Sequence, residues 1–198
     1  MALGSILVLG GARSGKSELA EKLAATMAGR ASAPGAEQDL SAGSVTYVAT
    51  GLIDTDDPDW TARVERHTTR RPPDWVTIEA GGRPDLDAVL DDIEGTALVD
   101  SLGTWVASVP GLEVDAEAVA AVVLRRAERG DVTVVVSEEV GLGVHPSTEA
   151  GRHFRDVLGV VNRTMSEVVD RAVLVVAGRV VCLDSAENVD EWLKCAKP

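Results

Sequence analysis

Short apolar runs alternate with stretches of helical periodicity along most of the chain. The apolar runs predict strands at residues 5–9, 45–49, 75–79, 96–100, 132–137, 172–177 and 179–183. The periodic stretches predict helices at residues 16–29, 57–69, 85–93, 115–129 and 147–169. We expect Gly29 to close the first helix and Asp115 to cap the fourth.

Strands that alternate with helices predict an α/β fold, in which helices cover both faces of a mostly parallel sheet. The last two strands are expected to pair as a hairpin at the sheet edge. Residues 28–43 are rich in Ala, Gly, Ser and Pro, which is typical of a surface loop. No repeat or clear boundary interrupts the pattern, so residues 1–183 are interpreted as one domain and residues 184–198 as a polar tail.

The charge of the chain narrows the class of its partners. A formal net charge of −13 over 198 residues argues against general nucleic-acid binding, because a polyanion would be repelled. No apolar run approaches the length of a membrane span. Strand-like sequence soon after Met1 leaves no room for a cleavable signal peptide, and Cys182 and Cys195 are expected to be reduced thiols. We therefore expect a cytoplasmic protein without membrane insertion.

Residues 10–17, GGARSGKS, match the pattern G-x-x-x-x-G-K-[ST] between a predicted strand and a predicted helix. In such a loop, backbone N–H groups and the helix N-terminus favour phosphate oxygens. Lys16 is expected to reach the β and γ phosphates, and the Ser17 hydroxyl to bind Mg²⁺. The expected nucleotide cradle consists of Gly10, Gly11, Ala12, Arg13, Ser14, Gly15, Lys16 and Ser17.

Two acids end predicted strands, and we expect both to lie at the same edge of the sheet. Asp100 closes an apolar run and is the best candidate for a second Mg²⁺ ligand, with a helix cap as its alternative role. Glu79 ends the third strand, where ligands of such sheets bind. For Glu79 a structural role is as good an interpretation as a functional one.

Four arginines surround His67 within residues 63–71 of this acidic chain. On a helix, His67 would share a face with Arg63 and with Arg70 or Arg71. Neighbouring guanidinium groups disfavour the charged imidazole, which keeps it nucleophilic, and they also hold phosphates. The sequence therefore suggests a covalent histidine intermediate, and the alternative is a solvated basic helix with an incidental histidine.

Taken together, these blocks resemble one family, the bifunctional adenosylcobinamide kinase/adenosylcobinamide-phosphate guanylyltransferase of cobalamin biosynthesis. The resemblance covers residues 5–183 and is carried by GGARSGKS, YVATG (47–51), RVERHTTRRPPDW (63–75) and LVDSLGTWV (98–106). It continues in VVVSEEVGLGVHP (134–146) and GRHFRDVLGVVNRTMSEVVDRAVLVVAG (151–178). The histidine block and the SxEVGxGxxP block are far more specific than the phosphate loop.

The resemblance implies a single-domain P-loop NTPase with a RecA-like sheet, assembled as a homo-oligomer, often a trimer. It implies phosphorylation of adenosylcobinamide by ATP or GTP, followed by transfer of GMP from GTP through a histidine to adenosylcobinamide phosphate. His67 falls at the position of the guanylylated histidine. By the same matching, the nucleotide contacts beyond the phosphate loop are Ala49, Thr50, Gly51, Thr68, Thr69, Arg70, Arg71, Glu79 and Asp100.

Two departures from the family pattern lie near the expected site. Glu138 stands where the family commonly has Asn, and Ser101-Leu102-Gly103 stands where it usually has Cys-Leu-Thr. A negative charge at Glu138 is expected to weaken binding of a phosphorylated substrate unless it faces away or meets a cation.

Three other functions are weighed against this one. A P-loop kinase that lacks the guanylyltransferase step would not need a histidine nucleophile. A nucleotide-binding regulatory module would show no turnover with a corrinoid. A DNA-dependent RecA-like ATPase is disfavoured by the net charge and by the few aromatic residues.

Overall fold

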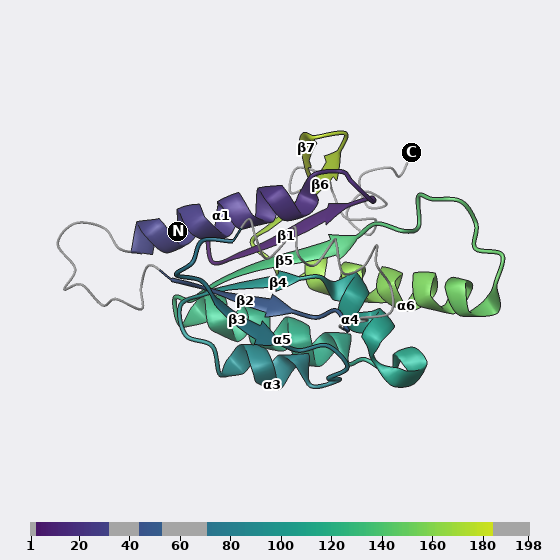
Figure 1. Cartoon of the computed structure of the whole chain (residues 1–198), viewed down its shortest axis with the longest axis horizontal. Helices are drawn as coiled ribbons and strands as arrows, with labels where there is room; N and C mark the ends of the chain where they lie inside the picture. Colours follow the sequence, from purple (N-terminus) through teal and green to yellow (C-terminus); the bar gives the residue numbers. More distant parts are fainter. Residues whose placement is uncertain (1–2, 32–43, 53–70, 184–198) are drawn as a thin grey trace, which may run out of the picture.

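The computed structural model describes residues 3–31, 44–52 and 71–183 (Figure 1). All of the strands in these ranges join one seven-stranded sheet in the order β3-β2-β4-β5-β1-β6-β7. The strands are β1 (Ser5–Gly10), β2 (Val45–Ala49), β3 (Val76–Glu79), β4 (Thr96–Asp100), β5 (Val132–Glu138), β6 (Arg171–Val176) and β7 (Arg179–Cys182). Neighbouring strands are parallel except for β6 and β7, which form an antiparallel hairpin at the edge.

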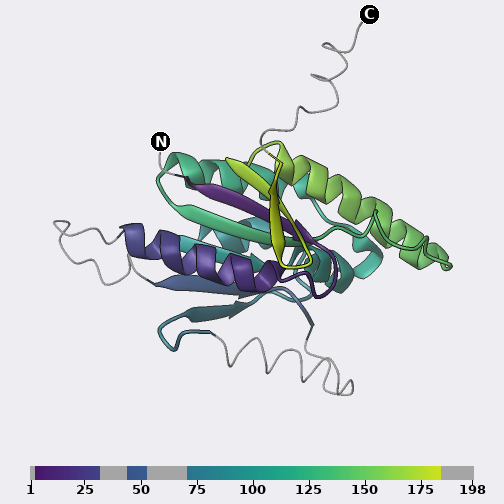
Figure 2. The ribbon, with the colours of Figure 1, turned by 90° about the horizontal axis from the view of Figure 1, so that it is seen from above.

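Helices cover both faces of this sheet. They are α1 (Lys16–Ala31), α3 (Leu86–Asp91), α4 (Leu102–Ser108), α5 (Ala116–Glu128) and α6 (Glu149–Ser166), with a short 3-10 helix η1 (Pro110–Leu112). Helix α1 packs on one face against β1, β2, β4 and β5, and the other helices lie on the opposite face (Figure 1 and Figure 2). Among the described residues, no helix has the length and apolar character needed to cross a membrane.

Alternate residues of each central strand enter two separate cores. Ile6 and Val8 of β1 pack with Ala20 of α1, whereas Leu7 and Leu9 pack in the core beneath α3–α6. Because successive side chains of a strand point to opposite faces, a strand covered on both faces is largely apolar. This explains the mostly apolar runs of the sequence.

The structure confirms the predicted fold class, a mostly parallel sheet with helices on both faces and a C-terminal hairpin. The predicted strands agree with the observed ones to within a residue or two, and Asp115 caps α5 by accepting a hydrogen bond from Ala118 N at 2.9 Å. The predicted helix at 57–69, most of the loop at 28–43 and the tail at 184–198 lie outside the described residues.

Two helical features differ from the prediction. Helix α1 continues to Ala31, because Gly29 does not adopt the positive φ of a terminating glycine. Helix α4 was not predicted, since it is a short element between a strand and a turn. Ser101 caps it, and the Ser101 and Thr104 side chains satisfy each other's backbone N–H groups in a capping box. The spacing of Ser101 before apolar Leu102, Trp105 and Val106 is the signal that would have revealed it.

The parallel strands bring their carboxyl ends to one edge of the sheet, where ligands of such folds bind. In register, Asp100 lies beside Ala49, which lies beside Glu79, while Gly10 lies beside Glu138. Strand β5 separates β1 from β4. The phosphate loop and the predicted metal ligand Asp100 therefore come from strands that are not direct neighbours.

Candidate active site

The phosphate loop connects the end of β1 to the first turn of α1. Gly15 has a φ of +98°, and Arg13 also has a positive φ, so the backbone turns tightly between strand and helix. A Cβ on Gly10 would lie 2.5 Å from Ser14 Oγ and 2.8 Å from the Val175 carbonyl oxygen, which excludes any larger residue there. The loop thus has the tight backbone turn that the expected phosphate cradle requires.

The exposure of the loop fits a phosphate ligand. Gly11, Ala12 and Arg13 are exposed, whereas the Ser14 and Lys16 side chains are buried. Ser14 Oγ has no hydrogen-bond partner among the described residues. A buried hydroxyl without a partner is costly, and a phosphate oxygen in the cradle would satisfy it.

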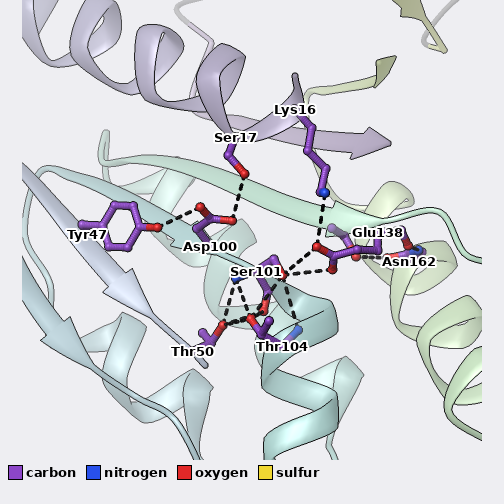
Figure 3. Close-up of polar contacts among 10 residues, drawn as sticks. Lys16, Ser17, Tyr47, Thr50, Asp100, Ser101, Thr104, Glu138 and Asn162 are labelled. Atoms are coloured by element: carbon purple, nitrogen blue, oxygen red, sulfur yellow. Dashed lines mark hydrogen bonds and ion pairs between the residues drawn. The ribbon is translucent and has the colours of Figure 1, made fainter. Parts of the chain in front are cut away.

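Asp100 is held between two hydroxyl groups from different elements (Figure 3). Ser17 Oγ, at the start of α1, donates to Asp100 Oδ1 at 3.4 Å, and the Tyr47 hydroxyl of β2 donates to Asp100 Oδ2 at 2.8 Å. A hydroxyl and a carboxylate are the hard oxygen ligands that Mg²⁺ prefers. The donor set therefore fits the predicted ion.

The environment of Tyr47 keeps it a hydrogen-bond donor. Burial raises the pKa of the Tyr47 hydroxyl above its ordinary value, and the negative charge of Asp100 raises it further against the opposing effect of Arg71. Tyr47 is 2% exposed. Its proton is thus fixed toward the Asp100 carboxylate over the whole physiological pH range.

Arg71 brings the end of the histidine block to this part of the sheet. Its guanidinium lies 3.4 Å from the centroid of the Tyr47 ring, and its Nη1 donates to Thr77 Oγ1 at 3.3 Å. The Arg71 Nε is buried and has no hydrogen-bond partner in the part of the chain that the structure describes. His67, Thr68, Thr69 and Arg70 lie outside the described residues.

Glu138 forms an ion pair with a cation, which is one of the conditions under which its negative charge is expected to be tolerated. Its Oε1 lies 3.3 Å from Lys16 Nζ, and Ser101 Oγ is placed to donate to Oε1 at 3.1 Å or to Oε2 at 2.9 Å (Figure 3). A Cβ on Gly103 would collide with the same carboxylate. The residues that depart from the family pattern therefore touch one another, and Ser101 and Gly103 accommodate Glu138.

The turn after β2 is fastened to the end of β4. Thr50 is fully buried, and its Oγ1 donates to the Ser101 carbonyl at 2.6 Å and accepts from Ser101 N at 2.9 Å. Ala49 and Gly51 are the residues directly before and after Thr50 in this turn. Glu79 is exposed at the end of β3, on the face of the sheet that it shares with Tyr47.

Tyr47 and Ser101 lie within the family motifs of the sequence, but the motifs alone assign a role to neither residue. The signal for Tyr47 was available, because residues at alternate positions of a strand share a face and Tyr47 is two positions from the end of β2. The signal for Ser101 was its place directly after Asp100, where an N-cap hydroxyl is expected before a helix.

Comparisons with known proteins show which family the chain belongs to. The family described as "Cobinamide kinase / cobinamide phosphate guanyltransferase" matches residues 6–183. The chain is 32% identical over 190 residues to "Bifunctional adenosylcobalamin biosynthesis protein CobU" of Salmonella typhimurium, a match that covers 87% of this chain and 96% of the relative. It is 34% identical over 180 residues to "Bifunctional adenosylcobalamin biosynthesis protein CobP" of Pseudomonas aeruginosa, covering 87% and 92% respectively.

Among solved structures, the flagellar accessory protein FlaH from Methanocaldococcus jannaschii aligns with a TM-score of 0.48 and 14% identity, over 89% of this chain and 74% of that one. The family match spans nearly the whole of the described structure, and its relatives are matched over almost their full length. The chain therefore belongs to the cobinamide kinase / cobinamide phosphate guanyltransferase family.

Proposed function

We propose that this enzyme phosphorylates the aminopropanol hydroxyl of adenosylcobinamide with ATP or GTP and then converts adenosylcobinamide phosphate to adenosylcobinamide-GDP. Family membership supports both activities. The observation that carries the proposal is the contact of Ser17 with Asp100 beside the buried Lys16. This contact supports the proposal that a triphosphate and its metal ion bind at this edge of the sheet.

The kinase step uses the groups of the phosphate loop. Backbone N–H groups of residues 10–15 bind phosphate oxygens, and Lys16 contacts the β and γ phosphates. Ser17 and Asp100 would hold Mg²⁺, which would neutralise charge on the phosphates. Tyr47 orients the Asp100 carboxylate for this task, in the way that hydrogen bonds from outside a metal site orient its ligands.

The guanylyltransferase step uses His67 as the nucleophile. An imidazole nitrogen bonds to the α-phosphorus of GTP while the bond to the β-phosphate oxygen breaks, and pyrophosphate leaves. A phosphate oxygen of adenosylcobinamide phosphate then takes the GMP group, and the phosphorus–nitrogen bond breaks. Arg71, four residues after His67 in the sequence, has its guanidinium beside Tyr47, which supports a role for the block near Asp100.

The nucleotide contacts that we propose are those expected from the resemblance. They are Gly10, Gly11, Ala12, Arg13, Ser14, Gly15, Lys16, Ser17, Ala49, Thr50, Gly51, Thr68, Thr69, Arg70, Arg71, Glu79 and Asp100. We further propose that the enzyme acts in the cytoplasm as a homo-oligomer, in the trimeric form that the resemblance implies, and that it does not bind nucleic acid.

Mass spectrometry of the corrinoid tests the proposal directly. Purified protein is incubated with adenosylcobinamide, GTP and Mg²⁺, and the corrinoid is followed with time. We expect it to gain a phosphate first and a GMP group second, and a Lys16→Ala variant to form neither product. A wild-type protein that binds GTP but leaves the corrinoid unchanged would contradict the proposal.

A further inference from the structure

We propose that Glu138 is the proton acceptor of the kinase step, taking the proton of the substrate hydroxyl as it attacks the γ-phosphorus. This inference rests on the proposed function and deepens its first half. It assigns a role in catalysis to a side chain that the resemblance does not predict at this position.

The position of Glu138 places its carboxylate beside the group that is transferred. Glu138 is the last residue of β5 and pairs in register with Gly10, where the phosphate loop begins. Its Oε1 is 3.3 Å from Lys16 Nζ. Because the lysine of such a loop contacts the β and γ phosphates, the carboxylate lies one hydrogen-bonding group away from the γ-phosphoryl group. An ammonium has three donors, so Lys16 can hold phosphate and Glu138 together.

The surroundings of Glu138 fix its carboxylate in one orientation. Ser101 Oγ is within hydrogen-bonding distance of both carboxylate oxygens. The backbone is fixed as well, since the Glu138 carbonyl accepts from Asn162 Nδ2 at 3.0 Å. Gly103 leaves the space that the carboxylate fills. A base that is held in this way does not need to be reorganised when the reaction occurs.

Among the described acids at this edge, Glu138 also has a side chain that a substrate can partly reach. Its side chain is 22% exposed, compared with 6% for Lys16. Asp100 is engaged by Ser17 and Tyr47, and Glu139 Oε1 accepts from Gly141 N at 2.8 Å within its own turn. Glu79 lies on the edge strand β3, and strands β2 and β4 separate β3 from β5 and β1.

The step balances as an ordinary phosphoryl transfer. The substrate oxygen forms a bond to the γ-phosphorus while the bond from that phosphorus to the β-phosphate oxygen breaks, and the nucleoside diphosphate leaves. The hydroxyl proton passes to the Glu138 carboxylate and is later lost to water. Guanylylation of the enzyme involves no alcohol proton, so Glu138 serves the first reaction and not the formation of the covalent intermediate.

The test separates these two reactions in Glu138→Gln, which keeps the size of the side chain but cannot accept the proton. Adenosylcobinamide and γ-labelled ATP report phosphorylation, and α-labelled GTP without corrinoid reports labelling of the protein. We expect the kcat for phosphorylation to fall about 100-fold, with the KM for ATP and the labelling of the protein within about threefold of wild type. Glu149→Gln, at an exposed position in the first turn of α6, is the matched control and should leave both reactions unchanged.

A second variant moves the carboxylate without removing it. In Gly103→Ala the new methyl group displaces the carboxylate of Glu138 from this position, so phosphorylation should fall about tenfold while the thermal unfolding midpoint stays near that of wild type. Wild-type kcat with a lowered KM for ATP in Glu138→Gln would instead show that Glu138 only neutralises Lys16 in the empty site, and would overturn the proposal. An equal loss of both reactions would overturn it too.

The outcome for wild type separates this inference from the proposed function. If wild type phosphorylates the corrinoid and Glu138→Gln does so at the same rate, only the assignment of Glu138 fails. If wild type never phosphorylates the corrinoid, the proposed kinase activity fails and the inference fails with it.

Discussion

The Tyr47 hydroxyl lies 2.8 Å from Asp100 Oδ2, while Ser17 Oγ lies 3.4 Å from the other oxygen of the same carboxylate. A strand and a helix N-terminus, far apart in sequence, therefore orient one acid. The Arg71 guanidinium also stacks on the Tyr47 ring. This single tyrosine thus connects the proposed metal ligand to the described end of the histidine block.

Because the chain has only one tyrosine, its ionisation can be followed by absorbance without ambiguity. Burial and Asp100 raise the pKa of Tyr47 above the ordinary value near 10, so the folded protein should show no tyrosinate signal at pH 10. The native state keeps a proton that the unfolded chain loses, so the contribution of Tyr47 to stability is present below about pH 10 and is lost as the pH rises further. Urea-unfolded protein, the control, should titrate near pH 10. Half-ionisation of the folded protein at that pH would contradict the buried contact.

Ser17 and Asp100 should behave as one unit in the use of Mg²⁺. We expect Ser17→Ala and Asp100→Asn each to lower kcat/KM for Mg²⁺-dependent consumption of ATP about 100-fold, and the double variant to be little worse than either. Thr26→Ala, on the exposed side of the same helix, is the control. Losses that multiply in the double variant would mean that the two side chains act independently.

The fold could be predicted from the sequence because each central strand is buried on both faces and therefore appears as a short, mostly apolar run. The phosphate loop was readable because its backbone geometry demands glycine at fixed positions. Helix α4 was missed because it has only seven residues and its cap, Ser101, adjoins an acid that already had another interpretation.

The contacts within the site were harder to predict, because they depend on which strands are neighbours. Sequence does not state that β5 lies between β1 and β4, and this order brings Glu138 to Lys16. It likewise does not state that Gly103 and Ser101 accommodate Glu138. The negative charge of Glu138, which is unfavourable when judged from the sequence alone, is paired with Lys16 in the structure.

A buried arginine outside the site should matter for stability. Arg126 is fully buried, and burial lowers its pKa to about 10, which still leaves it charged at neutral pH. Its guanidinium donates to Thr133 Oγ1 and to four backbone carbonyls, those of Leu90, Ile93, Gly95 and Val132.

Replacing Arg126 removes these hydrogen bonds from a fully buried site, although the Leu90, Ile93 and Gly95 carbonyls each keep one other donor. Arg126→Met should therefore lower the free energy of unfolding by about 3 kcal/mol, measured by urea denaturation. The neighbouring Arg125 is exposed and forms a 3.6 Å ion pair with Asp91, so Arg125→Met should cost about 0.5 kcal/mol. Equal losses for the two variants would refute the structural role of Arg126.

Arg71 should contribute more than its charge. Its planar guanidinium stacks on Tyr47 and also bonds to Thr77, and a lysine cannot do both. We expect Arg71→Lys to slow labelling of the protein by α-labelled GTP about tenfold, with little change in thermal stability. Arg83→Lys, at a surface ion pair with Asp85, should leave labelling unchanged. Full labelling in Arg71→Lys would remove Arg71 from the site.

The most direct test of the account is to trap the nucleotide on the enzyme. Purified protein is incubated with α-labelled GTP and Mg²⁺ without corrinoid, and is then separated by denaturing electrophoresis. We predict a label that is labile to acid and stable to alkali, as a bond between phosphorus and a histidine nitrogen requires, and that is absent in His67→Ala while phosphorylation of adenosylcobinamide persists. No label on a wild-type protein that binds GTP would contradict the covalent step and leave a kinase alone.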